Sequence, residues 1–232
     1  MRKILIFLIT IFLYGALPSW YYEIKDINKQ KQAFIKIMLP LIREENQNII
    51  ILRRKIINIF KDPYFLLRLD ELLFLAKIAD KYKIKSFNKK EFLKKVDIIP
   101  PSLILAQAAI ESGWGKSRFA KVANNFFGHW TYSKNGISPK DKFDDINITY
   151  SIRKFKSIRA SLKAYMLNLN RNLAYKEFRE LRYKFRLLNK PFTGLVASQT
   201  MHNYSKLKNK YIQILKKVII YNNLEKFDKG EE

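Results

Sequence analysis

One glutamate follows a long apolar segment, in a setting that favours acid catalysis. Glu111 comes after the uncharged run 98–110 and directly precedes Ser112-Gly113-Trp114-Gly115. The run is nearly all apolar from residue 103, which predicts a buried helix, and the two glycines predict a sharp turn at its end. Burial beside a tryptophan disfavours a charged carboxylate, so the pKa of Glu111 should rise towards the range that a general acid needs. A helix cap or an ion pair with a lysine is the simpler alternative.

The elements that must position this glutamate are mainly helical. Pro100 and Pro101 fit the start of the helix that carries Glu111, because the first turn of a helix leaves its N–H groups unpaired. Apolar residues recur at helical spacing over 33–59, and Pro40 should kink or split that helix. Four leucines at positions 66, 69, 72 and 73 form a further helix face.

Two segments alternate apolar and polar residues as strands do. They are 127–132 and 146–155, and Asn135-Gly136 offers a turn between them. We therefore expect a mainly α fold (α+β), in which a small β-hairpin lobe covers one side of the helical domain.

Composition excludes several kinds of catalyst. The 232 residues contain no cysteine and only two histidines, His129 and His202, without an HExxH pattern. Thiol catalysis, disulfides and cysteine-based zinc sites are therefore excluded, and a zinc hydrolase is not expected. We expect neither a metal ion nor an organic cofactor.

The chain is strongly basic. Its 45 Lys and Arg against 20 Asp and Glu give a net charge of +25, which attracts nucleic acid, acidic lipid or acidic polymers. The cations are spread along the chain and no recognition motif is present, so we expect no specific nucleic-acid partner. A nucleic-acid or lipid binder with strongly salt-dependent affinity is the alternative that charge alone suggests.

The first 19 residues have the pattern of a secretory signal. Arg2 and Lys3 precede the apolar run 4–13, which is short for a membrane span, and small residues follow. An uncut anchor is the alternative, and it would associate the protein with the membrane. In either case we expect the body of the protein in the periplasm or cell envelope.

Three stretches resemble a known family. AQAAIESGWGKSRFA, NNFFGHW and HNYSKLKNKYIQILKKVIIYNNL resemble the Bax-type bacterial glucosaminidases, relatives of the FlgJ muramidase domain. The resemblance implies a lysozyme-like helical domain with a β lobe and an N-terminal helical extension. It implies a peptidoglycan hydrolase that cleaves N-acetylglucosaminyl β-1,4 bonds, with Glu111 as the general acid.

The resemblance also assigns residues around Glu111. It carries over a tyrosine near the acid to Tyr204, with Tyr211 as the second candidate. The substrate-binding positions that it implies are Trp114, Asn124, Asn125, Phe127 and Gly128. The two asparagines could instead make a turn, and Tyr204 could instead anchor the last helix to the core.

A second carboxylate is harder to assign. Relatives of FlgJ are expected to place a glutamate in the β lobe, but no glutamate lies between Glu111 and Glu177. Asp141, Asp144 and Asp145 are the acids available there; Asp144 and Asp145 are the alternatives for the catalytic base, of which Asp145 is our candidate. A solvated loop is the alternative for these aspartates, in which case the substrate's acetamido group or a bound water would act instead.

These observations divide the chain into a signal peptide or anchor (1–19), a helical extension (20–87), a glucosaminidase domain (88–226) and a tail (227–232). We expect a monomer that binds peptidoglycan glycan strands. The alternatives are a lytic transglycosylase, which also needs a single acid, and a catalytically weak wall-binding module.

Overall fold

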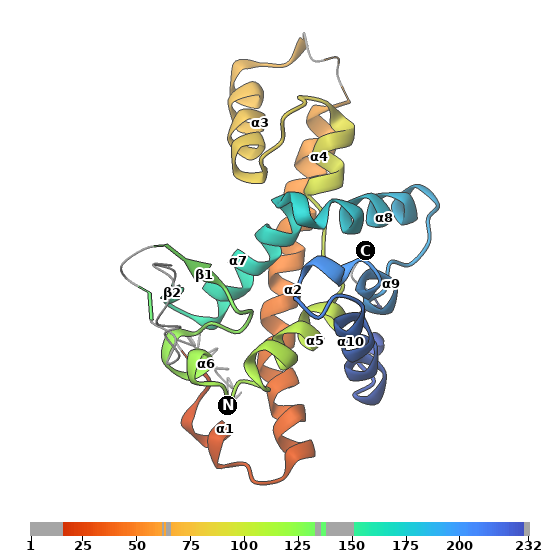
Figure 1. Cartoon of the computed structure of the whole chain (residues 1–232). Coiled ribbons are helices and arrows are strands. Elements are labelled where there is room, and N and C mark those ends of the chain that lie inside the picture. The colour runs from red at the N-terminus through yellow and green to blue at the C-terminus, as the bar shows by residue number, and fades with distance from the viewer. Residues whose placement is uncertain (1–15, 62, 64–65, 133–135, 138–150, 230–232) are drawn as a thin grey trace, which may run out of the picture.

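One long helix, α2, runs along the molecule and takes part in two hydrophobic cores (Figure 1). The computed structural model describes residues 16–61, 63, 66–132, 136–137 and 151–229. Its α-helices are α1 (Ser19–Glu23), α2 (Ile27–Ile59), α3 (Leu69–Tyr82), α4 (Lys89–Lys95), α5 (Pro101–Ser112), α6 (Arg118–Ala123), α7 (Ile158–Arg171), α8 (Lys176–Leu187), α9 (Gly194–Ser198) and α10 (Asn209–Tyr221). The 3-10 turns are η2 (Leu173–Tyr175), η3 (Met201–Asn203) and η4 (Glu225–Phe227), and the strands are β1 (Trp130–Thr131) and β2 (Ser151–Ile152). The expected mainly helical fold with a small β lobe is confirmed.

Helix α2 continues through Pro40, so of the expected kink or split the split does not occur. Pro40 lies on the exposed side of the helix, where water can satisfy the carbonyl that loses its N–H partner. The opposite side is buried at Phe34, Met38 and Ile42. Packing of this apolar face outweighs the local preference of one proline.

The larger core surrounds α5. Apolar residues of α2, α7, α9 and α10 pack against this helix, which is buried along nearly its whole length. A smaller core joins the C-terminal part of α2 to α3 and α4 through Ile56, Leu75 and Phe92. The helix that carries the candidate acid is therefore held from several sides.

The described residues of the β lobe form two short strands. β1 and β2 pair antiparallel, with Trp130 opposite Ile152, and Ile137 forms a bridge on the other side of Ile152. Of the expected strands 127–132 and 146–155, only two residues each form β1 and β2 in the described part of the chain. Residues 138–150, and Asn135 of the expected turn, lie outside the described residues.

A buried carboxylate ties the start of α5 to α2 and α8. Asp97 is fully buried, and its oxygens lie 2.8 Å from Arg186, 3.5 Å from Arg53 and 3.9 Å from Arg182. Burial disfavours the charged carboxylate, but the three arginines outweigh it and hold the pKa of Asp97 below its usual value. Arg182 also donates hydrogen bonds to the carbonyls of residues 94, 97 and 98.

A second carboxylate, from the expected tail, caps α5. Asp228 accepts hydrogen bonds from the Ser102 N–H (2.9 Å), the Ser102 hydroxyl (2.6 Å) and the Gly194 N–H (2.9 Å). These bonds pair donors that the first turns of α5 and α9 would otherwise leave unsatisfied. Burial nevertheless raises the pKa of Asp228 above its usual value.

The expected signal segment is only partly described. Residues 1–15 lie outside the described residues, whereas Leu17 is buried in the larger core beside Gly115. Within the described ranges, no helix combines the length and the apolar character needed to cross a membrane.

Candidate active site

Glu111 lies in the last turn of α5, next to a tight turn. The helix begins with Pro101 at its first position and ends at Gly113, which has the left-handed φ of +55°. Trp114 and Gly115 also have positive φ, at +55° and +76°. The backbone therefore leaves the helix immediately after Glu111, and the carboxylate is half-buried rather than enclosed.

A tyrosine from the last helix holds one oxygen of this carboxylate. The hydroxyl of Tyr211 donates a hydrogen bond of 2.9 Å to Oε1 of Glu111. Burial raises the pKa of Glu111 above its usual value, and the bond from Tyr211 opposes part of that rise by stabilising the charged form. The direction of the shift is the one predicted from the sequence.

Behind Tyr211, a chain of hydrogen bonds reaches the buried interior. Tyr165 donates to Oε1 of Gln107 (2.5 Å), and Nε2 of Gln107 donates to the hydroxyl of Tyr211 (3.3 Å). Each donor therefore points towards Glu111. This arrangement fixes the Tyr211 hydroxyl as a donor to the carboxylate, since the hydroxyl oxygen is already accepting from Gln107.

The other oxygen of Glu111 faces Gly128. A Cβ at position 128 would lie 3.5 Å from Oε2, and the φ of Gly128 is +67°, which disfavours residues with side chains. Gly128 is itself exposed. The absence of a side chain therefore leaves Oε2 uncovered on this side.

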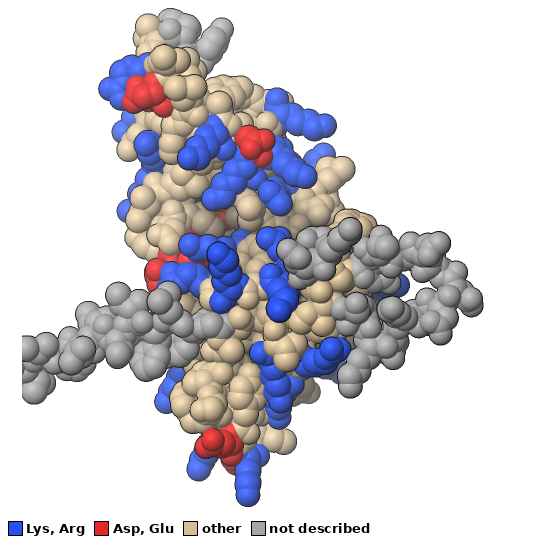
Figure 2. Space-filling view, turned by 90° about the vertical axis from the view of Figure 1, so that its left-hand side faces the viewer, with Lys and Arg blue, Asp and Glu red and all other residues tan. Residues whose placement is uncertain are grey.

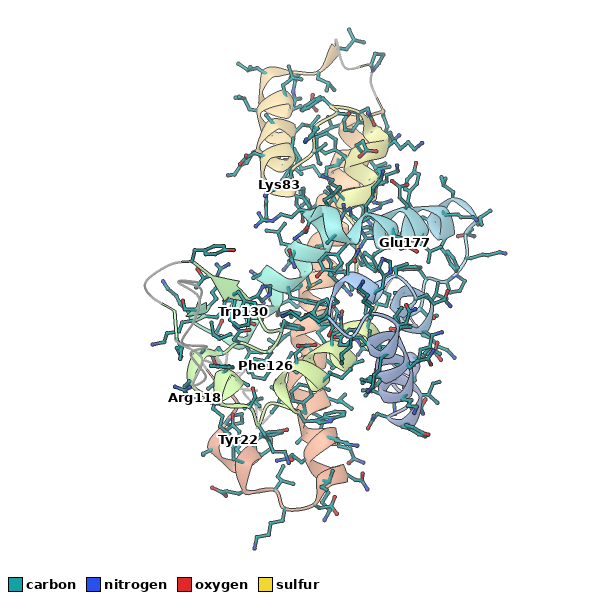
Figure 3. The ribbon with its side chains drawn as sticks, viewed as in Figure 1. Tyr22, Lys83, Arg118, Phe126, Trp130 and Glu177 are labelled. Atoms are coloured by element: carbon teal, nitrogen blue, oxygen red, sulfur yellow. The ribbon has the colours of Figure 1, made fainter. Side chains whose placement is uncertain are left out.

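The loop that carries Gly128 is fixed at both ends. It begins at the fully buried Phe126 and ends at the exposed Trp130, both labelled in Figure 3. The Asn125 side chain accepts from the His129 N–H and donates to the carbonyls of His129 and Arg153. These bonds hold Gly128 against Glu111.

Stacked aromatic rings complete the surroundings of the site. Tyr204 stacks on Tyr211 with centroids 5.5 Å apart, and Phe127 stacks on Tyr165 with centroids 4.1 Å apart. Burial raises the pKa of Tyr211, Tyr165 and Tyr204 well above the usual tyrosine value. These phenols are therefore neutral hydrogen-bond donors at any working pH, and not nucleophiles.

The structure separates the two candidate tyrosines. Tyr211, our second candidate, contacts Glu111, while the hydroxyl of Tyr204 donates to the carbonyl of Phe127 at 3.2 Å. Tyr204 therefore touches the site through the loop and through its stacking on Tyr211.

Trp114 and Asn124 both have structural contacts. The Trp114 ring packs edge-on against Phe34 of α2 at 5.5 Å, and its carbonyl accepts a hydrogen bond from Tyr21. Asn124 ends α6 in the left-handed conformation and donates to the Phe155 carbonyl, while its Oδ1 is buried without a hydrogen-bond partner among the described residues. The turn role considered for the asparagine pair is thus present in the structure.

The candidate base is not described. Asp145, like Asp141 and Asp144, lies outside the described residues. Within the described part, burial and the bond from Tyr211 account for the pKa shift of Glu111. That part of the chain also contains no cluster of three or more histidine and acidic side chains that could hold a metal ion.

Sequence reasoning missed the residues behind the acid. Gln107 stood out as the only polar side chain within a buried apolar run, which was a usable signal. The position of Tyr165 is compatible with ordinary core packing, and only the fold brings its hydroxyl to Gln107.

Comparison with known proteins identifies the family. The glucosaminidase family model, described as mannosyl-glycoprotein endo-beta-N-acetylglucosaminidase, matches residues 88–224. Protein bax of Escherichia coli (strain K12) is 32% identical over 182 residues, which cover 76% of this chain and 64% of that protein. A Streptococcus pneumoniae protein (serotype 4, strain ATCC BAA-334 / TIGR4) with the provisional name endo-beta-N-acetylglucosaminidase is 43% identical over 44 residues, or 19% of this chain and 7% of its own length.

The chain spans slightly less than two thirds of the length of protein bax and a small part of the streptococcal protein. No solved structure matches the chain significantly. The family model nevertheless covers more than half of the chain and includes Glu111, Gly128 and Tyr211. This chain is a member of the glucosaminidase family.

Proposed function

We infer that this protein is a peptidoglycan hydrolase that cleaves N-acetylglucosaminyl β-1,4 bonds with Glu111 as the general acid. The observation that carries this proposal is the environment of the Glu111 carboxyl group. Its pKa is raised by burial, one oxygen is held by Tyr211, and the other oxygen faces an exposed glycine. Family membership and the name of the streptococcal relative support the reaction class.

The two oxygens of Glu111 would have different roles. Oε1 accepts the hydrogen bond from Tyr211, so the acidic proton is best placed on Oε2. Oε2 faces Gly128, where no side chain blocks a substrate. From there Glu111 would donate its proton to the glycosidic oxygen as the bond between that oxygen and the sugar C1 breaks.

The second half of the reaction needs a base or an internal nucleophile. Water would add to C1 and lose its proton to a carboxylate, for which Asp145 is the candidate, and a reducing N-acetylglucosamine end would result. Without such a carboxylate, the acetamido oxygen of the substrate would attack C1 as the bond to the glycosidic oxygen breaks and Glu111 protonates that oxygen; water would then open the intermediate and return a proton to the Glu111 carboxylate. Glu111 donates the proton to the leaving oxygen in both routes, and in the second route it also takes a proton from the attacking water.

The reaction would take place outside the cytoplasm. The pattern of residues 1–19 supports export to the periplasm or cell envelope, either with cleavage of the segment or with the segment retained as an anchor.

The test is digestion of purified peptidoglycan by the full-length protein, with the products read by mass spectrometry. Glu111→Gln keeps the shape of the side chain and removes the acid, and Glu177→Gln makes the same change at an exposed position on α8. We expect reducing N-acetylglucosamine ends from the unmodified protein and from Glu177→Gln, but none from Glu111→Gln.

Other products would change the assignment. Anhydro ends would move the protein to the lytic transglycosylases. Retained binding to peptidoglycan without any products from the unmodified protein would identify a wall-binding module. Asp145→Asn tests the base separately, because loss of turnover with intact binding would assign Asp145 to the second step.

A further inference from the structure

A groove of about 690 Å3 lies beside the site but does not include Glu111. α2, the end of α3, α7 and the β lobe form its walls. Its charged lining residues are Glu45, Lys81, Arg153, Lys163 and Arg171, and His129 also lines it; we call it the basic groove. Figure 2 shows Lys and Arg side chains gathered across the middle of the face that has α3 at its top.

Helix α7 lies between the two features: one face of it packs behind the Glu111 site, and another face lines the basic groove. Tyr165 of this helix hydrogen-bonds to Gln107 behind the acid. Lys163 and Arg171 line the groove instead. Their positions, two residues before and six residues after Tyr165, place them on the opposite face of the helix. The groove is therefore a separate feature that shares a wall with the site.

Among the described residues, the cations that line the groove outnumber the acids that line it. Glu45 is the one acidic lining residue in the described part of the chain, and it already lies 3.2 Å from Arg159 and 3.4 Å from Lys163. Lys81, Arg153 and Arg171 form no ion pair with any described residue. The Arg153 guanidinium lies 4.8 Å from the centroid of the Phe155 ring, which limits its freedom to turn away.

One residue that lines the groove, His129, has a ring nitrogen without a hydrogen-bond partner among the described residues. This nitrogen, Nε2, is buried. Burial, together with the charge of Arg153, lowers the pKa of His129 to about 4. The imidazole is therefore neutral at pH 7. An anion bound nearby would raise the pKa of His129, which is the opposite of the effect of Arg153.

The groove lies close to the acid along the chain. His129 follows Gly128, whose position faces Oε2 of Glu111, and the Arg153 N–H donates to the His129 carbonyl. Neighbouring residues are about 3.8 Å apart between their Cα atoms. A polymer that reaches Glu111 on one side of this loop can thus place a substituent in the groove on the other side.

We propose that the basic groove binds carboxylate groups of the peptide stems that branch from the glycan strand being cut. This proposal rests on the proposed function, because it assumes that peptidoglycan is the substrate. Arginine suits carboxylates, since its planar fork donates two parallel hydrogen bonds. Phosphate has the same attraction for arginine and could come from wall polymers or lipid headgroups, so it forms a separate arm of the test.

The experiment measures binding to full-length Glu111→Gln, which cannot turn over its ligand if Glu111 is the acid. The ligands are glycan fragments that carry their peptide stems, the same fragments after enzymatic removal of the stems, and inorganic phosphate. Binding is followed by calorimetry and by the NMR signals of the His129 ring. The chain has two histidines, so His202→Gln assigns the signals.

Two matched variants isolate the groove. One combines Arg153→Gln with Arg171→Gln, and the other combines Lys184→Gln with Lys217→Gln, which removes the same charge at exposed positions outside the groove. We expect about tenfold tighter binding of stem-bearing than of stem-free fragments. The groove variant should lose this preference and the control should keep it, and the His129 signals should move only with stem-bearing fragments or phosphate.

Equal affinity for both fragments, or a preference that survives in the groove variant, would overturn the proposal. Saturable phosphate binding at His129 without a preference for stems would also overturn it, and would reassign the groove to phosphate. Cleavage of stem-free glycan by the unmodified protein tests the proposed function independently. A protein that cleaves but shows no preference disproves only the groove assignment.

Discussion

Replacing Tyr211 by phenylalanine tests how the acid is tuned. The substitution removes the hydroxyl that donates to Glu111 and retains the ring that stacks on Tyr204. A hydrogen bond to a charged group contributes about 1.5–3 kcal/mol, and one pKa unit corresponds to about 1.4 kcal/mol. Because this bond stabilises the carboxylate, its loss should raise the pKa of Glu111 by roughly one to two units.

The pKa can be measured directly by NMR titration of protein labelled with 13C in the glutamate carboxylates, with Glu111→Gln to assign the signal. Activity gives a second readout. A general acid works while protonated, so the alkaline limb of the pH–activity profile should move to higher pH by a similar amount.

Tyr204→Phe is the matched control. It removes a buried phenol of the same stack, but its hydroxyl donates to the Phe127 carbonyl and not to Glu111. The pKa of Glu111 should therefore stay close to that of the unmodified protein. An unchanged or lowered pKa in Tyr211→Phe, or an equal rise in Tyr204→Phe, would refute this account of the acid.

Three further substitutions test other parts of the structure. Gly128→Ala should cost about 1–2 kcal/mol of stability, because φ is positive there, and should lower turnover further by covering Oε2 of Glu111; denaturation and product assays separate the two effects. Asp97→Asn should lower the free energy of unfolding by about 3–5 kcal/mol, since it leaves buried arginines uncompensated. The native pKa of Asp97 is depressed, so its stabilisation should fade as pH drops through that pKa, and the asparagine variant should lack this acid dependence. Asp228→Asn should cost about 1–3 kcal/mol in urea denaturation by weakening its bonds to Ser102 and Gly194.

The burial and raised pKa of Glu111 could be predicted because the residues that cause them lie close to it in the sequence. An uncharged run, a proline start and a glycine turn all lie within residues 98–115, and they led to the prediction of a buried helix with a carboxylate of raised pKa at its end. The resemblance then indicated the loop at Gly128 and the tyrosines of the C-terminal segment. It placed Tyr204 ahead of Tyr211 as the tyrosine near the acid, whereas the structure brings the hydroxyl of Tyr211 to Glu111, because the choice depends on how α10 packs against α5.

The mistakes arose where tertiary packing outweighs local preference. α2 passes through Pro40 because its other face is buried. In α3 the leucines singled out by spacing stay largely exposed at Leu69 and Leu73, while Leu75, Ile78 and Tyr82 pack inward. Helical periodicity identified the helix correctly, but several faces were apolar and spacing alone could not select the buried one.

The cap that Asp228 places on α5 also bears on when the site can form during biosynthesis. Asp228 is separated from Ser102 by 126 positions, so a ribosome must add all of that chain before the partner of the α5 N-terminus exists. Tyr211, which holds Glu111, likewise follows it by 100 positions. A nascent chain that does not yet include Tyr211 and Asp228 therefore lacks both contacts, and the acid reaches its final geometry only after both residues have been added.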